Sequence, residues 1–427
     1  MSDRTLLLLL ALIVAVGSIA TNLYIPALPS VREHFGADVA HVQATFSISL
    51  ITFAIGMLAW GPISDRYGRR RAVLTGMSIV ILGATIGMTA QSLPWLIVGR
   101  AVQAFGTSVG IAVSRAIISD RFPVDRMASA IAQLAIVSVL TNGLAPVLGG
   151  FLTAGFGWRA VFAALILFAL VPTYFAWRHL PETRDQTRPP PNTHEMFSTA
   201  GRLARNRLYV SCALQTSLSY ALFLVFLSLA PYVMVSALGR PTTDYGFYYL
   251  FIAVGYVLGN LSLRWLGGRR SAHWMIAVGG IVQAVASVAA LVFVAAGLMH
   301  PLWIFVPMFF LYIGQGLFMP NMSAIAVGQA PQHAGVASST LGFLQQIIAA
   351  FCVQLMGLTP TDTAVPMLAF GAAASLLQLG VLWLSPRIEA GTALTPSPLP
   401  QAGEGVDALT HLPSPGLSAD LSRKRER

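Results

Sequence analysis

The sequence predicts an all-α membrane protein whose 12 transmembrane helices form two pseudo-symmetric six-helix bundles. Three observations support this fold class. Hydrophobic residues make up 56% of the 427-residue chain and charged residues 10%, whereas a soluble domain carries about 25% charged residues. The apolar residues gather in 12 stretches, each about long enough to cross a bilayer. One long polar interruption separates the first six stretches from the last six.

The expected helices follow one another through short connections. Strands are excluded because the stretches are long and evenly apolar, and because lipid cannot satisfy the polar groups of an open sheet edge. The first stretch lacks a clean cleavage site, so we expect a retained helix rather than a signal peptide. In order, the helices are expected at 5–28, 41–63, 72–91, 94–117, 128–154, 158–178, 208–237, 244–265, 272–298, 300–328, 333–358 and 363–385.

The polar segments divide the chain into four parts. Residues 1–178 are expected to form the N-terminal bundle and residues 208–385 the C-terminal bundle, with 179–207 as a cytoplasmic central loop. Residues 386–427 are rich in Pro, Gly and Ser. They cannot bury enough apolar surface to fold, so we expect a disordered cytoplasmic tail.

The arginines predict the orientation in the membrane. Loops after even-numbered helices and the central loop carry most of them, whereas the opposite loops hold only Arg32, Arg159 and Arg240. Positively charged short loops stay in the cytoplasm, so both termini are expected there. The same asymmetry accounts for the net charge of +10, and we therefore expect no nucleic-acid partner.

The sequence contains no pattern typical of a catalytic or metal-binding site. The two cysteines, Cys212 and Cys352, lie in separate apolar stretches, which suits packing residues better than a disulfide or a metal site. No nucleophile with its base and no H-E-x-x-H pattern occurs. We expect no enzyme activity, no catalytic residue, no metal and no cofactor.

A charged segment with glycines follows the second expected helix. It runs from Gly61 to Arg71 as G-P-I-S-D-R-Y-G-R-R-R. Anchoring by positive charge would explain the arginines but not the aspartate or the glycines. Asp65 can accept from the N-terminus of another helix, where unpaired amides and the macrodipole favour an anion. We interpret the segment as a conformational latch formed by Gly61, Asp65, Arg66, Gly68, Arg69 and Arg70.

This segment matches G-x-x-x-D-R-x-G-R-R and so resembles the loop signature of the major facilitator superfamily. The resemblance implies that family's fold, alternating access between two bundles, and a latch partner at the start of the eleventh helix, near Ala334. A weak echo at 259–270 agrees with duplicated halves.

Two further segments are similar to the same superfamily. Arg100, followed by Gln103, resembles its membrane-embedded arginine. An arginine at that depth needs a wet cavity or polar partners, and a structural arginine bound to backbone remains the alternative. Pro146, Gly149 and Gly150 resemble an antiporter signature and are expected to kink the fifth helix, which favours export or exchange over uptake.

The segment Thr21–Pro29 resembles the bicyclomycin-resistance (Bcr/CflA) subfamily of drug:proton antiporters, and 157–159 and 181–183 agree with it. The chain has Asn22 where the resemblance would place an aspartate, and no acid or histidine lies near the middle of an expected helix. Proton antiport is therefore implied by the resemblance alone. A rim carboxylate, Asp120 or Asp244, is the candidate proton carrier, with uniport or exchange as alternatives.

The resemblance also implies a central cavity between the bundles. Arg100 without a buried anion favours neutral or zwitterionic cargo over lipophilic cations. Hydrogen bonding and packing between helices is the alternative role for the other polar and aromatic side chains. The expected cavity residues are Asn22, Tyr24, Arg100, Gln103, Gln215, Tyr220, Tyr312, Gln315 and Asn321.

These features together predict a secondary transporter of the bacterial inner membrane. It would export small, mainly neutral or zwitterionic amphiphiles of the amphenicol or bicyclomycin type, as a multidrug efflux protein, driven by a proton gradient. The alternative is an exporter or exchanger of an endogenous amino acid, small peptide or sugar that is not coupled to protons. The expected partners are a small-molecule substrate and membrane lipid, and we expect a monomer.

Overall fold

The computed structural model describes residues 2–184, 193–267 and 269–384. In these ranges the regular structure is helical, and 12 helical segments are long and apolar enough to cross a membrane. Each corresponds to one expected stretch, which confirms the predicted all-α class. The tail expected at 386–427 lies outside the described residues.

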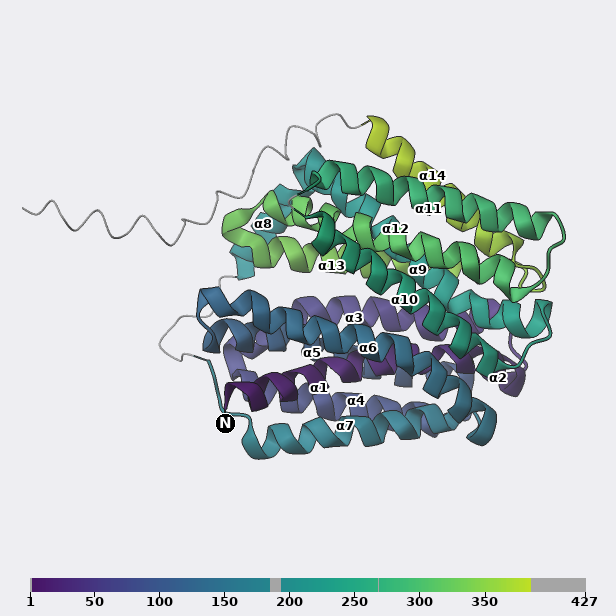
Figure 1. The fold of residues 1–427 in the computed structure, drawn as a ribbon. Coiled ribbons are helices and arrows are strands. Elements are labelled where there is room, and N and C mark those ends of the chain that lie inside the picture. Colours follow the sequence, from purple (N-terminus) through teal and green to yellow (C-terminus); the bar gives the residue numbers. More distant parts are fainter. Residues whose placement is uncertain (1, 185–192, 268, 385–427) are drawn as a thin grey trace, which may run out of the picture.

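The first half of the chain forms the lower group of helices in Figure 1. The first expected helix is longer than predicted and forms one span, Asp3–Phe35. Pro26 and Pro29 do not end this span, because each stands in the first turn of a new helical segment, where its missing N–H is tolerated. The elements are α1 (Asp3–Asn22), η1 (Ile25–Ala27), α2 (Leu28–Phe35), α3 (Val39–Tyr67), α4 (Arg69–Met88), α5 (Leu93–Arg121), α6 (Val124–Phe156) and α7 (Arg159–His179).

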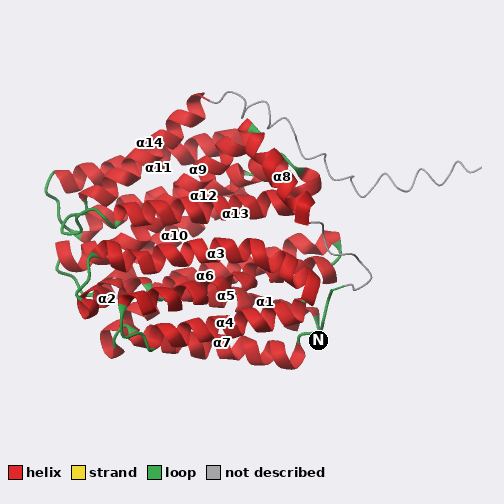
Figure 2. Ribbon diagram, turned by 180° about the vertical axis from the view of Figure 1, so that it is seen from behind, coloured by secondary structure: helices red, strands yellow, loops and turns green. Residues whose placement is uncertain are grey.

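The second half forms the upper group, which Figure 2 shows from behind. Its elements are α8 (Thr193–Arg205), α9 (Arg207–Tyr232), η2 (Val233–Ala237), α10 (Thr242–Leu266), α11 (Ala272–Ala295), α12 (Pro301–Gly328), η3 (Pro331–His333), α13 (Ala334–Met356) and α14 (Val365–Leu384).

Helix α8 was not expected, because we predicted residues 179–207 to be a loop. It packs against α9 and α13 and buries Thr199 and Leu203 there. We predicted a loop because prolines and charged residues surround this short amphipathic helix. Its stability comes from packing against neighbouring helices rather than from its own hydropathy.

The two groups repeat the same pairings. The contacts of α3 and α4 with α5 correspond to those of α10 and α11 with α12, and the α1–α6 contact corresponds to α9–α13. The groups meet where α3 packs against α13 and where α6 packs against α10. This pattern agrees with the predicted pseudo-symmetric arrangement of two six-helix bundles.

Close packing of α4 against α5 sets the position of the central arginine. A Cβ on Gly99 would lie 2.6 Å from the backbone nitrogen of Gly87. Only glycine allows the two backbones to approach this closely. The contact holds the adjacent Arg100 inside the lower group, where it reaches α1.

The two ends of the molecule differ in how the groups meet. At one end, here called the Asp38 end, Gln43 Nε2 donates to the carbonyl of Ser228 at 3.2 Å and Gln354 Nε2 donates to that of Ala40 at 3.0 Å. At the other end, called the Asp65 end, a cavity of about 800 Å³ lies between the groups. Pockets of about 640 Å³ and 630 Å³ also open at the Asp38 end, but the groups are hydrogen-bonded to each other there. The described residues that line the Asp65 cavity make no hydrogen bond across it, so the groups are joined at the Asp38 end and apart at the Asp65 end.

Candidate functional site

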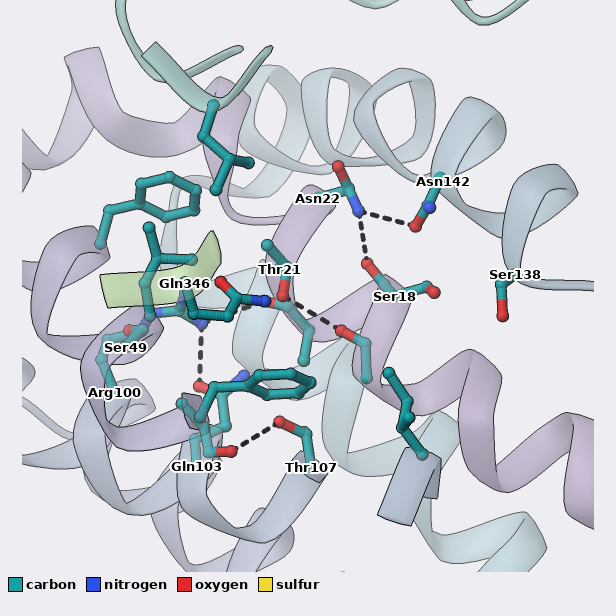
Figure 3. Close-up of a pocket in the computed structure, with 18 of the residues that line it drawn as sticks. Ser18, Thr21, Asn22, Ser49, Arg100, Gln103, Thr107, Ser138, Asn142 and Gln346 are labelled. Carbon is teal, nitrogen blue, oxygen red and sulfur yellow. Dashed lines mark hydrogen bonds between the residues drawn. The ribbon is translucent and has the colours of Figure 1, made fainter. Parts of the chain in front are cut away.

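Two adjoining cavities lie between the helix groups. The first has a volume of about 230 Å³ and is lined mainly by α1, α3 and α5, with further residues from α6, α9 and α13 (Figure 3). The second has a volume of about 160 Å³ and is lined by α6, α9, α10 and α12. Asn142, Tyr220 and Phe223 line both. Small polar groups converge on mostly apolar walls, which is typical of a small-molecule site.

Arg100 lies in the wall of the first cavity, with 2% of its surface exposed. Its Nη1 donates to the carbonyl of Ala20 at 3.0 Å and to Gln103 Oε1 at 3.2 Å. Its guanidinium lies 4.4 Å from the ring centre of Tyr24. Because α1 ends at Asn22, the carbonyls of its last turn lack partners within the helix, and a cation is favourable there. Arg100 thus combines both alternatives, since it borders the cavity and bonds to backbone.

Asn22 connects α1 to α6. Its Nδ2 donates to the carbonyl of Ser18 at 2.9 Å and to Asn142 Oδ1 at 3.0 Å (Figure 3). Its Oδ1 is buried and has no hydrogen-bond partner among the described residues. We had not predicted Asn142 as a cavity residue. The available signal was an amide in an apolar helix, four residues before Pro146.

The second cavity has an aromatic wall. The rings of Phe223 and Tyr312 meet edge to face with centres 5.6 Å apart. Gln346 Nε2 donates to the Tyr220 hydroxyl at 3.3 Å, whereas the Tyr312 hydroxyl is buried and has no partner in the described part of the chain. Gln315 borders the same cavity and donates to the carbonyl of Ser219 at 2.7 Å.

Among the described residues, Arg100 is the only charged one that lines either cavity. No described carboxylate borders them, so a positively charged ligand would find no counter-ion among these residues. A neutral or zwitterionic ligand avoids that cost.

Six of the nine expected cavity residues line one of the two cavities: Asn22, Arg100, Gln103, Tyr220, Tyr312 and Gln315. The structure places the other three elsewhere. Tyr24 stacks on Arg100 and shares a 2.9 Å hydrogen bond with Thr45. Gln215 donates to Ser211 Oγ at 3.3 Å, and Asn321 donates to the carbonyl of Leu317 at 2.8 Å. Only the Tyr24–Thr45 bond joins two elements, as the alternative role between helices requires. The bonds of Gln215 and Asn321 stay within α9 and α12.

The expected latch segment lies at the Asp65 end. Asp65 pairs with Arg69, whose Nη1 lies 2.5 Å from Oδ1. Arg69 Nε also donates to Asp120 Oδ2 at 2.9 Å. Asp65 and Ala334 line the same 800 Å³ cavity. The expected bond from Asp65 to the start of α13 is therefore not formed in this conformation, because the groups are apart here and Arg69 occupies the carboxylate.

A carboxylate from the end of the first half holds the latch segment. Glu182 accepts from the backbone nitrogens of Arg69 at 2.8 Å and Arg70 at 3.3 Å, at the N-terminus of α4. Gly68 precedes them with φ of 99°, a conformation that favours glycine. Arg70 Nη2 donates to the carbonyl of Trp177 at 2.6 Å. The remaining latch residues are placed as follows: Gly61 lines the cavity, and Arg66 is exposed.

The residues of the antiporter-like signature bring α6 close to two neighbours. Pro146 lies inside α6. A Cβ on Gly149 would collide with the carbonyl oxygen of Leu23, and one on Gly150 would lie 3.2 Å from that of Thr242. The signature thus lies where α6 contacts both the end of α1 and the start of α10.

Comparisons with known proteins identify the kind of molecule. Residues 10–353 match a protein-family model described as Major Facilitator Superfamily. Multidrug resistance protein D of Escherichia coli (strain K12) is 28% identical over 83% of this chain and 89% of its own. A bicyclomycin resistance protein homolog of Haemophilus influenzae is 23% identical over 86% of this chain and 92% of its own.

A solved structure supports the fold independently. The crystal structure of a peptide transporter, POT, in complex with sulfate has a TM-score of 0.75 at 17% identity, covering 91% of this chain and 95% of its own. The family and these relatives are transporters, not enzymes. Together with the 12 apolar helices, they identify a multi-pass bacterial membrane protein.

Proposed function

The chain belongs to the Major Facilitator Superfamily, and we propose that it exports small, mainly neutral or zwitterionic amphiphiles by alternating access. The observation that carries this proposal is the chemistry of the two central cavities. Their single charged residue, Arg100, is already bound to Ala20, Gln103 and the Tyr24 ring. The rest of the lining is aromatic, aliphatic or neutral polar. Such walls accept varied apolar cargo while few hydrogen bonds need to be satisfied.

We propose that the protein is a monomer in the bacterial inner membrane with both termini in the cytoplasm. The distribution of arginines supports this orientation. It makes the Asp65 end cytoplasmic, so the conformation described here faces inward. Exposed apolar side chains such as Leu8, Leu82 and Leu167 then face lipid.

The proposed cycle moves the two bundles, 1–178 and 208–385, as rigid bodies. When the cytoplasmic cavity closes, the start of α13 approaches Asp65. The amides of Ala334 and its neighbours then compete with Arg69 for that carboxylate, because a helix N-terminus favours an anion. The bonds that Gln43 and Gln354 make at the Asp38 end break in the same movement.

The driving force in this proposal is an inward proton gradient. Resemblance of Thr21–Pro29 to drug:proton antiporters supports it. Since none of the described carboxylates lines the central cavities, the proton-binding group would be a rim carboxylate. Asp120, which shares Arg69 with Asp65, is our first candidate, and Asp244 at the start of α10 is the second.

The same observation favours one other function. A cavity lined by Arg100 and no described carboxylate does not need protons to move a neutral metabolite. Exchange of an endogenous amino acid, small peptide or sugar, without proton coupling, is therefore the second candidate.

Transport by purified protein in liposomes tests both candidates. We expect saturable transport of labelled chloramphenicol, an uncharged amphenicol, above that of protein-free liposomes and above that of ethidium. Strong, saturable ethidium transport with little chloramphenicol transport would overturn the proposal. Acceleration by an imposed proton gradient would select antiport, whereas an unchanged rate with acceleration by unlabelled cargo on the other side would select exchange.

A further inference from the structure

The orientation of two amides in the first cavity is fixed by a backbone carbonyl. Asn22 Nδ2 lies 2.9 Å from the carbonyl oxygen of Ser18, which can only accept a hydrogen bond. The nitrogen of Asn22, and not its oxygen, must therefore face Ser18. The same nitrogen lies 3.0 Å from the side chain of Asn142, so Asn142 must present its oxygen. One carbonyl thus determines how both side chains are turned.

This arrangement leaves two groups without partners. Both hydrogens of Asn22 Nδ2 are used, and Asn22 Oδ1 has no donor. The Nδ2 of Asn142 makes no hydrogen bond to a described residue. Asn22 is 5% exposed, and a buried acceptor without a donor costs about 1–3 kcal/mol. Neighbouring side chains beside the cavity therefore carry one uncharged acceptor, Asn22 Oδ1, which is buried in this conformation, and one uncharged donor, Asn142 Nδ2.

We propose that the Asn22–Asn142 pair recognises a neutral carboxamide-like group of the cargo. An N–H of the cargo donates to Asn22 Oδ1, and its carbonyl oxygen accepts from Asn142 Nδ2. Asn142 also acts as a positioning residue, because its oxygen holds Asn22 with the acceptor turned away from Ser18. This inference rests on the proposed function and names the polar group that the exported compounds share.

The surroundings of the pair suit the rest of such a compound. Asn142 borders both cavities, so a molecule bound to it extends toward the aromatic wall of Phe223 and Tyr312. Asn22 Oδ1 is covered by neighbouring atoms in this conformation. Binding therefore requires these neighbours to move aside, which couples recognition to a change of conformation.

The cargo cannot be recognised in the same way by a carboxylate at position 22. An aspartate there has no hydrogen to donate to the Ser18 carbonyl or to Asn142 Oδ1, so both contacts would become repulsive. Asparagine supplies the acceptor without charge and keeps both contacts. The pair thus selects cargo by hydrogen-bond pattern rather than by charge.

Binding of two matched ligands to the purified full-length protein tests this inference. Benzamide and acetophenone have similar size and share the ring and the carbonyl, but only benzamide has N–H donors. We expect wild type to bind benzamide about tenfold more tightly by calorimetry, the effect of one or two neutral hydrogen bonds. We expect the ratio of the two dissociation constants to fall toward one in Asn142→Leu, since Asn22 then keeps only its bond to Ser18 and its acceptor is held less firmly.

Two further variants distinguish the loss of the Asn22 orientation from a general disruption of the site. Asn142→Asp keeps an acceptor for Asn22 Nδ2, so we expect it to restore most of the ratio. Thr141→Val changes the neighbouring position of the same helix outside both cavities, where the hydroxyl donates to the Val137 carbonyl at 2.8 Å and the Ser138 carbonyl at 3.0 Å, and we expect the wild-type ratio. Because the ligands partition equally into detergent with every variant, a change in ratio reports the site.

Three results would overturn the inference: no benzamide binding by wild type, equal affinities for the two ligands, or a ratio that survives in Asn142→Leu. Failure of the proposed function gives a different result. In that case the wild-type preference for benzamide would persist while liposomes show no transport of any neutral compound.

Discussion

The carboxylate of Asp65 lies 2.5 Å from Nη1 of Arg69, four residues further along the chain. This pair holds the carboxylate within its own bundle while the start of α13 lies across the cavity. Closing the Asp65 end must therefore exchange one partner of Asp65 for another. The pair explains how a single acid can favour either conformation with only a small difference in free energy.

Neutralising Asp65 is expected to slow export. Asp65→Asn removes the charge that attracts the start of α13, an interaction of about 1 kcal/mol, and we expect about fivefold slower transport in liposomes. The matched control is Asp3→Asn, because Asp3 and Arg121 form a 3.8 Å pair with both side chains more than half exposed. An exposed pair contributes little, so that variant should transport at the wild-type rate. Equal rates for both variants would contradict the latch.

Removing Arg100 is expected to destabilise the protein. Arg100→Ala leaves the Ala20 carbonyl without its donor and Tyr24 without its cation, a loss of about 1–3 kcal/mol. Thermal unfolding of purified variants measures it. Arg100→Lys keeps the charge but not the planar fork, so we expect an intermediate unfolding temperature. An Arg100→Ala protein as stable as wild type would show that these contacts contribute nothing.

Charge at position 22 is expected to change which cargo is carried. Asn22→Asp places a carboxylate beside cavities that otherwise hold only Arg100. We expect the ratio of ethidium to chloramphenicol transport to rise about tenfold, which corresponds to about 1.4 kcal/mol. Asn321→Asp makes the same change on α12 outside both cavities and should leave the ratio unchanged. A ratio unaffected by Asn22→Asp would exclude this wall from cargo binding.

The bonds at the Asp38 end are expected to keep that side closed. Gln354→Leu removes the donor to Ala40, and Gln43→Leu removes the donor to Ser228. With Ser49→Cys in the cavity and both native cysteines replaced, either change should speed labelling by an impermeant maleimide from the Asp38 side about threefold to tenfold. The exposed Gln133 on α6 provides the control, Gln133→Leu. An unchanged labelling rate in both Gln354→Leu and Gln43→Leu would contradict the claim that these bonds keep the Asp38 end closed.

The sequence predicted the helices well because apolar length is a strong signal that needs no tertiary information. It also indicated Arg100, since a charge within such a stretch requires partners. The sequence did not predict helix α8, because the burial of Leu203 depends on neighbouring helices. It did not predict the Asn22–Asn142 hydrogen bond either, because that bond joins residues 120 positions apart and depends on how the two helices are rotated.

The partner of Asp65 shows a different limit. A sequence resemblance can indicate which groups a carboxylate meets during a cycle, but not which one it meets in a given conformation. Here Arg69 is the partner, with Asp120 on the same guanidinium. Glu182 was noticed only as part of a similar segment, yet it caps the start of α4. Glu182 has this role because the chain after α7 folds back onto the latch segment. Hydropathy does not show such a contact.

The distance between the two bundles at the Asp65 end tests the central claim most directly. Spin labels at Arg66→Cys and Gln332→Cys, both exposed positions, report this distance across the cavity, and labels at Asp38→Cys and Asp362→Cys report the opposite end. Alternating access predicts two distances for each pair of labels. When cargo is added, the distance at the Asp65 end should decrease and the distance at the Asp38 end should increase. One unchanging distance at both ends, with and without transported cargo, would contradict the account.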